Sequence, residues 1–228
     1  MKNISRNIVR VISLCIVGLI AYAGLYVYNA TIHENAVLKE VIKRLEADSR
    51  IAEALVTDVQ YNPITQRNMT TIKFLEYDND QHPLTPKYFT FSGNIIQFQS
   101  LVVRFQDDFV KKGDALRGKS AYLFWKVFML DGANTQEYNI TPVNSIPEVY
   151  ALKSLDYKIQ ADFWKEFWEY ALDKSKADKA GIKNAQIEAP GSKFIPGILY
   201  TLKIEHSGGI RIDTSTIPDI FKGETILK

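Results

Sequence analysis

The chain has 228 residues, a net charge of +2 and a hydrophobic fraction of 46%, which is enough apolar mass for a buried core and argues against wholesale disorder. Acidic and basic residues are interspersed, so no basic block indicates nucleic-acid binding and no acidic tail indicates a cation store. Cys15 is the only cysteine, which excludes a disulfide and a cysteine-based metal site in the rest of the chain.

Val11–Tyr28 is an uncharged apolar stretch, just long enough for a membrane core that takes about 20 helical residues. It predicts a single transmembrane anchor after a basic flank, residues 1–10. Positive charge on a short N-terminal side keeps that side in the cytoplasm. We therefore expect a cytoplasmic N-terminus and a domain outside the cytoplasm, in the periplasm or at the cell exterior. The flanking cations are Lys2, Arg6 and Arg10.

Two other interpretations of this stretch remain open. Ala21–Tyr22–Ala23 fits the small-residue site at which a signal peptide is cleaved, although the apolar run continues through Leu25 and favours a retained anchor. A lipoprotein signal ending at Cys15 is disfavoured, because Leu14 is not the small residue that such a site needs. In each case the domain that follows is exported.

Residues 29–55 form the next segment, in which Ala30–Leu55 predicts a juxtamembrane helix. Leu38, Val41 and Leu45 repeat at the spacing of one helix face, with charged residues on the other faces. Such a helix could pack on its own domain or form a short coiled-coil stalk that joins copies. The pattern is too short for a firm coiled-coil prediction.

Residues 56–228 predict a mainly antiparallel β domain, either a sandwich or barrel-like. Short runs with apolar alternation are separated by turn residues, which is typical of these folds. Ser120–Leu130 is apolar on both faces and predicts a central strand with Trp125 buried. Two hairpins are expected, at 120–141 and 198–214. The expected strands are Leu55–Tyr61, Thr70–Tyr77, Tyr88–Phe91, Asn94–Phe105, Ser120–Leu130, Thr135–Thr141, Asn184–Glu188, Ile198–His206 and Ile210–Thr214.

Asp156–Lys174 predicts an amphipathic helix rich in aromatic residues. Phe163 and Phe167 share one stripe, which we assign to the core. Trp164 and Trp168 lie on the neighbouring stripe, and we expect them to be at least partly exposed. Tryptophan is enriched at membrane interfaces and at protein interfaces, so these two residues are candidates for either contact.

No catalytic, metal-binding or cofactor-binding motif is visible. The three histidines, His33, His82 and His206, stand far apart without a ligand partner at zinc spacing. Asp78–Asn79–Asp80 offers oxygen ligands, but it lacks the glycine and the distal glutamate of a calcium loop and reads better as a turn. We therefore expect no cofactor and no metal.

The sequence thus predicts an α+β protein: a transmembrane helix and a juxtamembrane helix, followed by the β domain with one aromatic-rich helix. We expect a non-enzymatic, membrane-anchored cell-envelope protein that acts as a binding or scaffolding subunit with a protein partner or as a homo-oligomer, and no nucleic-acid partner. The alternative is a hydrolase or transferase acting on envelope lipid or glycan. Its candidate strand-end carboxylates are Asp131, Glu137, Glu205 and Asp213, whereas the candidate interaction surface is Trp164, Trp168, Leu38, Val41 and Leu45.

Overall fold

The computed structural model divides the chain into two compact units, Met1–Val41 and Ile42–Lys228. In the first unit, the described residues are helical and exposed. No helix among the described residues combines the length and the apolar composition that a membrane crossing requires. Most of the predicted anchor, and all of its basic flank, lies outside the described residues. The described residues are Leu19, Ala21, Tyr22, Gly24, Leu25 and residues 50–105, 120–131, 134–152, 156–179, 182–205 and 209–217.

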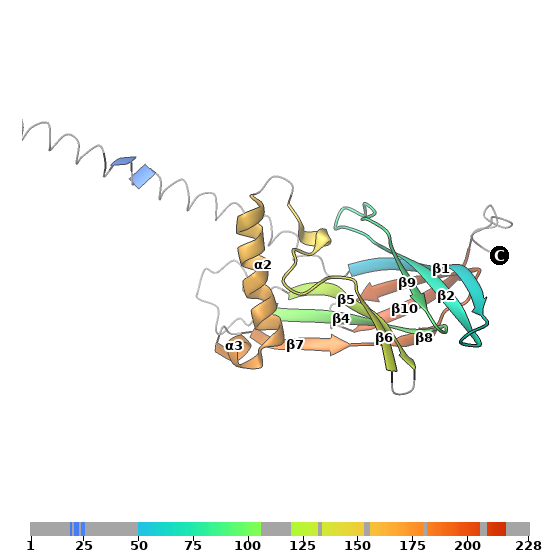
Figure 1. Cartoon of the computed structure of the whole chain (residues 1–228). Helices are drawn as coiled ribbons and strands as arrows, with labels where there is room; N and C mark the ends of the chain where they lie inside the picture. Colours follow the sequence, from blue (N-terminus) through green and yellow to red (C-terminus); the bar gives the residue numbers. More distant parts are fainter. Residues whose placement is uncertain are drawn as a thin grey trace, which may run out of the picture. The chain divides into compact units, whose positions relative to one another are not determined.

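The second unit contains two antiparallel β-sheets (Figure 1). The first sheet has the strand order β10-β9-β1-β2-β3, and the second has the order β6-β5-β4-β7, with β8 also paired to β4. The prediction of a mainly antiparallel β domain is therefore confirmed, as are both hairpins, β5–β6 and β9–β10. The strands are β1 (Arg50–Asn62), β2 (Arg67–Glu76), β3 (Lys87–Phe91), β4 (Ile95–Phe105), β5 (Ser120–Asp131), β6 (Asn134–Asn139), β7 (Ile182–Glu188), β8 (Gly191–Lys193), β9 (Ile198–Ile204) and β10 (Ile210–Thr216).

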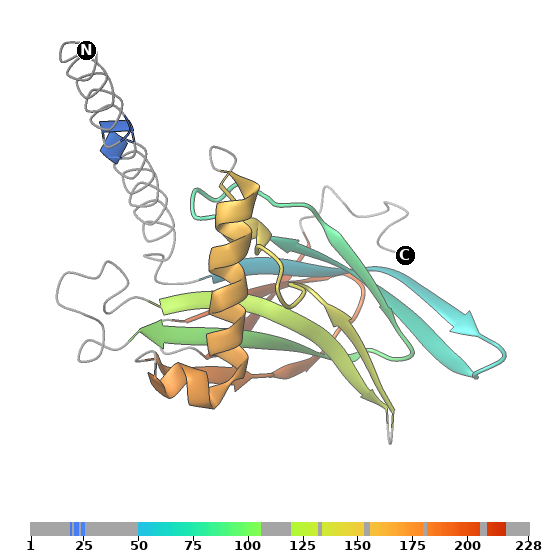
Figure 2. The same cartoon turned by 60° about the vertical axis from the view of Figure 1, so that its left-hand side comes forward.

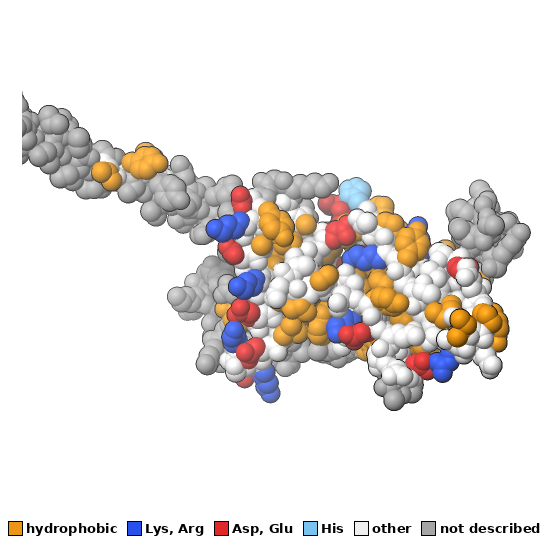
Figure 3. Space-filling view, viewed as in Figure 1, with side chains coloured by type: hydrophobic (Ala, Val, Ile, Leu, Met, Phe, Trp, Pro, Cys, Tyr) orange, Lys and Arg blue, Asp and Glu red, His pale blue; other side chains and the backbone are white. Residues whose placement is uncertain are grey.

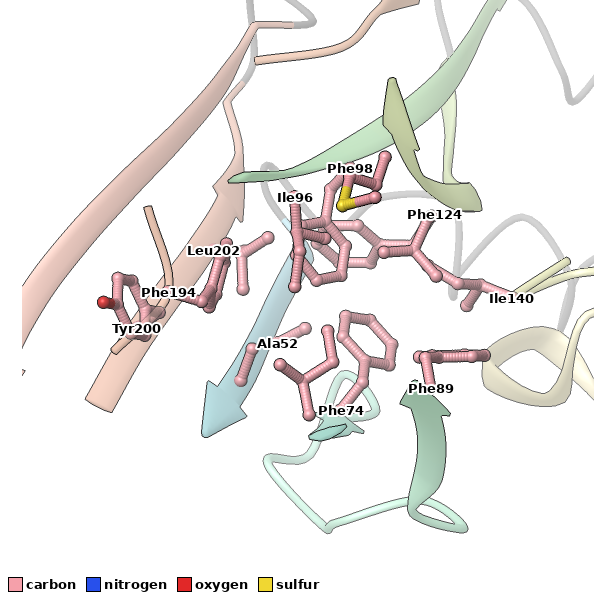
Figure 4. Packing of buried hydrophobic residues seen from close by; sticks show 14 of the residues in the cluster. Ala52, Phe74, Phe89, Ile96, Phe98, Phe124, Ile140, Phe194, Tyr200 and Leu202 are labelled. Carbon is pink, nitrogen blue, oxygen red and sulfur yellow. The ribbon is translucent and has the colours of Figure 1, made fainter. Parts of the chain in front are cut away.

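The main core lies between the two sheets, because alternate residues of each strand point inward. In β2, Ile72 and Phe74 are buried, whereas Lys73 between them is half-buried. The Phe74 ring lies 5.5 Å from the rings of both Phe98 and Phe124, which come from the second sheet. Figure 4 shows these aromatic side chains meeting at the centre of the cluster. Burying such a side chain is worth about 1.5–3 kcal/mol, so the pattern alone favours sheet-on-sheet packing.

A β-bulge at Trp125 keeps the apolar side chains of β5 on the core face. Phe124 and Val127 both belong to the core cluster although they stand three residues apart, where a regular strand would need an even spacing. The register with β4 shifts at this point, where Lys126 pairs with Gln99 and Phe124 with the next residue of β4. The bulge therefore absorbs the odd step in the sequence pattern.

Helix α2 (Tyr157–Leu172) covers the outer face of the second sheet (Figure 2). The short helix α3 (Lys174–Lys179) follows it, and both helices contact β7. The Trp168 ring lies 6.4 Å from the Trp125 ring of β5. This layer gives β5 a buried face on each side, which confirms the prediction of a central strand. The fully buried outer-face residues of β4 and β5 are Leu101, Val103, Ala121 and Leu123.

The segment before α2 attaches that helix to the sheet. The 3-10 helix η1 (Glu148–Tyr150) places the Tyr150 hydroxyl 3.2 Å from both the backbone nitrogen and the carbonyl oxygen of Tyr122 in β5. The Tyr150 ring stacks on Trp164 at 5.1 Å. Gln160 of α2 accepts a hydrogen bond from the N–H of Leu152 and donates one to its carbonyl oxygen. Aromatic stacking and satisfied backbone groups thus hold α2 in one rotation about its axis.

Side chains also join β3 to β6, the edge strands of the two sheets on one side. The Tyr138 hydroxyl donates to the carbonyl oxygen of Thr90 at 2.7 Å, and its ring packs against Phe91. The Gln136 amide accepts from the backbone N–H of Ser92 and donates to its hydroxyl. Side-chain contacts therefore cover this edge of the sandwich.

Three predictions about elements need correction. The helix predicted for Ala30–Leu55 is wrong from Arg50 onward, because β1 begins there and pairs with both β2 and β9. Residues 30–49 lie outside the described residues. Trp125 is half-buried, not fully buried, because it occupies the bulge. Helix α2 ends at Leu172, since Asp173 leaves the helical conformation and its carboxylate caps α3 by accepting the N–H of Ser175.

Candidate functional site

A hollow of about 740 Å³ opens at the end of the sandwich where β1 and β5 finish and β2 and β4 begin. Its lining comes from distant parts of the chain: the β1–β2 hairpin, the β3–β4 turn, the end of β5 and the loop after β8. That volume lies within the range of about 300–1,000 Å³ that ligand pockets occupy. The hollow is therefore the strongest candidate for a functional site among the described residues.

Close packing positions the walls of the hollow. A Cβ atom added at Gly93 would lie 2.9 Å from the sulfur of Met129, so the β3–β4 turn lies directly against β5. The backbone N–H of Phe194 donates to the carbonyl oxygen of Asn94 at 2.7 Å, which ties the loop after β8 to the same turn. Phe194 itself is fully buried and packs against the Tyr200 ring, with the ring centroids 4.1 Å apart. These contacts hold the hollow open between fixed elements.

The outer margin of the hollow carries exposed apolar side chains. Ile95 is 62% exposed and Leu130 is 63% exposed, and Val59 is exposed beside them. We call Val59, Ile95 and Leu130 the apolar rim. Tyr61 and Ile64 continue the exposed apolar surface along the β1–β2 hairpin. In Figure 3, hydrophobic side chains gather at the right-hand end of the molecule, over the tip of this hairpin.

One ion pair lies at the hollow, between Arg67 at the start of β2 and Asp131 at the end of β5. The pair joins the first sheet to the second. Both side chains are partly exposed, and ion pairs in such positions contribute only about 0–1 kcal/mol to stability. Its larger consequence is to hold one cation and one anion at fixed places beside the apolar rim.

The expectation that Trp164 and Trp168 are exposed is wrong. Trp164 is 1% exposed and Trp168 is fully buried, and the Trp168 indole N–H donates to the carbonyl oxygen of Ser145 at 2.9 Å. Phe167 is buried as expected, whereas Phe163 is half-buried. The two tryptophans pack α2 onto the second sheet and present no contact surface. Leu38, Val41 and Leu45 lie outside the described residues.

The charged residues of α2 indicate which face of the helix points towards the core. Lys158, Asp162, Lys165 and Glu169 repeat at intervals of three and four and are all exposed. At 3.6 residues per turn, the face opposite them is centred near Trp164, Phe167 and Ala171. The positions of the charged residues therefore predict which face of α2 is buried. The aromatic residues alone do not, because they cover two neighbouring stripes.

The four carboxylates of the hydrolase alternative do not form one site. Asp131 pairs with Arg67 at the hollow, and Glu137 pairs with Lys126. Glu205 and Asp213 both contact Arg211 in the β9–β10 hairpin of the other sheet. Only Asp131 among the four lines the hollow.

Asp78–Asp80 forms a turn, as expected. One oxygen of the Asp78 carboxylate accepts the backbone N–H groups of Asp80 and His82, at 2.9 and 2.8 Å. Burial opposes ionisation of this carboxyl, but the backbone hydrogen bonds from His82 and Asp80 and the nearby His82 ring together lower the pKa of Asp78. Ligand atoms of Asp78, Asp80 and His82 lie within 4.8 Å of one another. The hydrogen bonds account for the arrangement without a metal ion.

The hollow has no counterpart among the sites that the sequence predicts. Ile95 and Leu130 fall within predicted strands, and nothing in their local pattern distinguishes an end residue on the rim from a core residue. Leu130 next to the Asp131–Gly132 turn was the one available signal, since an apolar residue beside a hairpin turn falls at the margin of a sheet.

No protein-family model, no curated protein and no solved structure matches this chain.

Proposed function

We propose that this protein is a non-enzymatic, membrane-anchored subunit of the cell envelope that binds a protein partner through the hollow and its apolar rim. The observation that carries the proposal is the placement of Ile95 and Leu130, which expose most of their surface around a hollow. Contiguous exposed apolar surface beside polar residues is typical of protein interaction sites.

The position of the apolar side chains favours a polypeptide over a diffusible small ligand. Pockets for small ligands carry their apolar groups inside, where the ligand is enclosed. Here Val59, Ile95 and Leu130 project at the outer margin, so a partner large enough to cover the margin gains most from them. An apolar side chain of that partner would enter the hollow, with surrounding contacts that exclude water.

The ion pair places one positive and one negative group beside the apolar rim. Arg67 and Asp131 stand on opposite sheets and are partly exposed, so each retains capacity for a further hydrogen bond. Arginine is enriched at interface hot spots, where its planar group binds carboxylates in a fixed orientation. A partner segment with one apolar residue flanked by an acidic residue fits this arrangement best.

The proposed membrane anchor, and the proposed location of the domain outside the cytoplasm, are supported by Val11–Tyr28 and its basic flank. The hydrolase alternative is less well supported, because a glycoside hydrolase needs two carboxyl groups facing one cleft. Asp131 is the one candidate carboxylate at the hollow, and Arg67 pairs with it.

The test compares affinity purifications of the full-length chain from membranes. The rim variant carries Ile95→Ser and Leu130→Ser, and the control carries Tyr157→Ser and Leu172→Ser, which remove exposed apolar side chains from α2. All four positions are exposed, so both variants should keep the melting temperature of the wild type.

We expect one partner to be retained by the wild type and the control and to bind the rim variant at least about tenfold more weakly. Direct binding is then measured with the purified partner. A partner that binds both variants equally well would show that the hollow and its rim are not the binding site.

A further inference from the structure

Strand β10 is an edge of the first sheet. Among the described strands it pairs only with β9, and its last residues, Asp213–Thr216, are exposed. On the opposite side of the sandwich, the side chains of Gln136 and Tyr138 join β3 to β6. Edge strands commonly carry a proline, a bulge or charged side chains that prevent pairing with another chain. Strand β10 has no proline, and its charged residues, Arg211 and Asp213, have opposite signs.

The hydrogen bonds to β9 determine which backbone groups face the open side. The N–H of Glu205 donates to the carbonyl oxygen of Gly209, and the N–H of Ile217 donates to that of Gly197. Hydrogen-bonded and non-hydrogen-bonded pairs alternate in an antiparallel ladder. The odd-numbered residues of β10 therefore direct their backbone groups to β9. Ile212 and the even-numbered residues after it direct theirs to the open edge.

This alternation restricts how β10 could pair antiparallel with β10 of a second copy. Only even-numbered residues can form the hydrogen-bonded pairs of such a contact, since the groups of the odd-numbered residues are used by β9. A two-fold axis at Arg211 or Asp213 would place each of these charges opposite itself, which is unfavourable, so an axis at an even-numbered residue is favoured. An axis at Ile212 lets the two Ile212 residues exchange N–H···O bonds. It also places Arg211 directly opposite Asp213 of the second copy, twice by symmetry. An axis at Thr214 would instead place Asp213 opposite Ser215 and lose both charge pairs.

In the Ile212 register, opposite charges of the two copies face each other at short distance. Arg211 and Asp213 would form non-hydrogen-bonded pairs, in which side chains of facing residues approach most closely. Arg211 already contacts Glu205 and Asp213 of its own chain, at 2.8 and 3.1 Å, and Lys203 is its register partner on β9. Each copy therefore brings two cations and two anions to this surface, and the paired surface stays balanced.

We propose that β10 is the interface of a two-fold symmetric homodimer, in which the two β10 strands pair antiparallel about Ile212 and join the first sheets of two copies into one continuous sheet. The occupant of the edge is a second copy of this chain, because the pattern of Arg211 and Asp213 is complementary to itself. The surface is separate from the hollow, so this inference does not depend on whether the hollow binds a partner.

A cysteine experiment tests the register in the full-length chain in membranes. Cys15 is first replaced by serine, since it is the only cysteine. Facing residues of a hydrogen-bonded pair have Cα atoms about 5.5 Å apart, which suits a disulfide. Ile212→Cys should therefore form a disulfide-linked dimer under mild oxidation. Thr214→Cys is the matched control: in this register the two residues lie about 13 Å apart along the strands and should not cross-link.

Charge exchange tests the partner without a cross-link. Asp213→Lys alone puts like charges opposite each other at both symmetric positions and should weaken self-association by about tenfold. Arg211→Asp alone should do the same through facing acids. A mixture of the two variants restores two opposite-charge pairs and should recover association as a heterodimer. All of these side chains are exposed, so melting temperatures should stay close to that of the wild type.

Association is measured by light scattering of the full-length chain in detergent, with differently tagged copies for the mixture. A cross-link at position 212 but not at 214, together with recovery in the mixture, supports the homodimer. Equal cross-linking at both positions, or association that persists through either single charge change, overturns the register. A wild-type chain that remains monomeric at every accessible concentration overturns the interface itself.

Discussion

Tyr77 and Glu53 form a contact on the first sheet that no sequence pattern indicates. The Tyr77 hydroxyl donates to Oε2 of Glu53 at 2.6 Å. Burial is the largest cause that raises the pKa of Tyr77, and the hydrogen bond and the negative charge of Glu53 raise it further, to about 12. The folded state therefore favours the neutral phenol over the range in which an ordinary tyrosine ionises.

This contact predicts a pH dependence at alkaline pH. Because the pKa of Tyr77 is raised from 10.0 to about 12 on folding, its contribution to stability is fully present below pH 10 and is lost as pH rises from 10 towards 12. Tyr77→Phe should make the unfolding free energy fall less steeply over that interval. Urea unfolding followed by circular dichroism at several pH values measures the slope.

The control for this prediction is Tyr157→Phe, because Tyr157 is 75% exposed at the start of α2. It should retain the wild-type slope. Identical slopes for the wild type and Tyr77→Phe would show that the Glu53 contact does not persist in solution.

The rotation of helix α2 is the main question at the scale of the element. Three of its aromatic rings, Trp164, Phe167 and Trp168, form a buried edge-to-face set, and Tyr150 stacks on the first of them. Such pairs add about 0.5–1.5 kcal/mol beyond the burial of area. The helix thus contributes a second hydrophobic layer to the unit, on the face of the second sheet that points away from the first.

Trp164→Ala should lower the free energy of unfolding by about 3–5 kcal/mol, because it removes a fully buried side chain and leaves a cavity. Trp168→Ala should cost a similar amount and also leaves the carbonyl oxygen of Ser145 without its indole donor. Chemical unfolding followed by far-ultraviolet circular dichroism measures both values. Leu172→Ala, at an exposed position, is the control and should change stability by about 0.5 kcal/mol or less. Near-wild-type stability of Trp164→Ala would mean that α2 is docked differently.

The elements differ in how much of them the sequence could predict. Strand positions followed from period-two alternation and turn residues, since both are local properties of the chain. The start of β1 could not be predicted in this way, because Ala52 and Ala54 are compatible with a helix. Only the pairing with β2 and β9 decides between helix and strand here. Apart from the position of Leu130 beside a turn, no sequence pattern indicates the hollow, because Arg67 and Asp131 meet only through the packing of two sheets.

At the scale of the whole molecule, the two proposed contacts use different parts of the β unit. The hollow lies where β1 and β5 end, whereas the dimer contact follows the edge strand β10. A seven-residue edge pairing buries less surface than a standard stable interface, so on its own it would be weak. An N-terminal tether would raise the effective concentration of copies in one membrane and so strengthen such pairing without new contacts.

The division of the chain at Val41 and Ile42 gives the last prediction. The described core, with both sheets and α2, lies entirely in the second unit, so its stability should not require the first. A chain that begins at Ile42 should therefore unfold in one cooperative transition at the temperature of the full-length chain. It should also remain in the supernatant after membranes are sedimented, whereas the full-length chain should stay with membranes through a carbonate wash. Aggregation of the shortened chain would contradict the division into units. A full-length chain that is released by carbonate would contradict the anchor, because a spanning helix is not removed by changes in pH and salt.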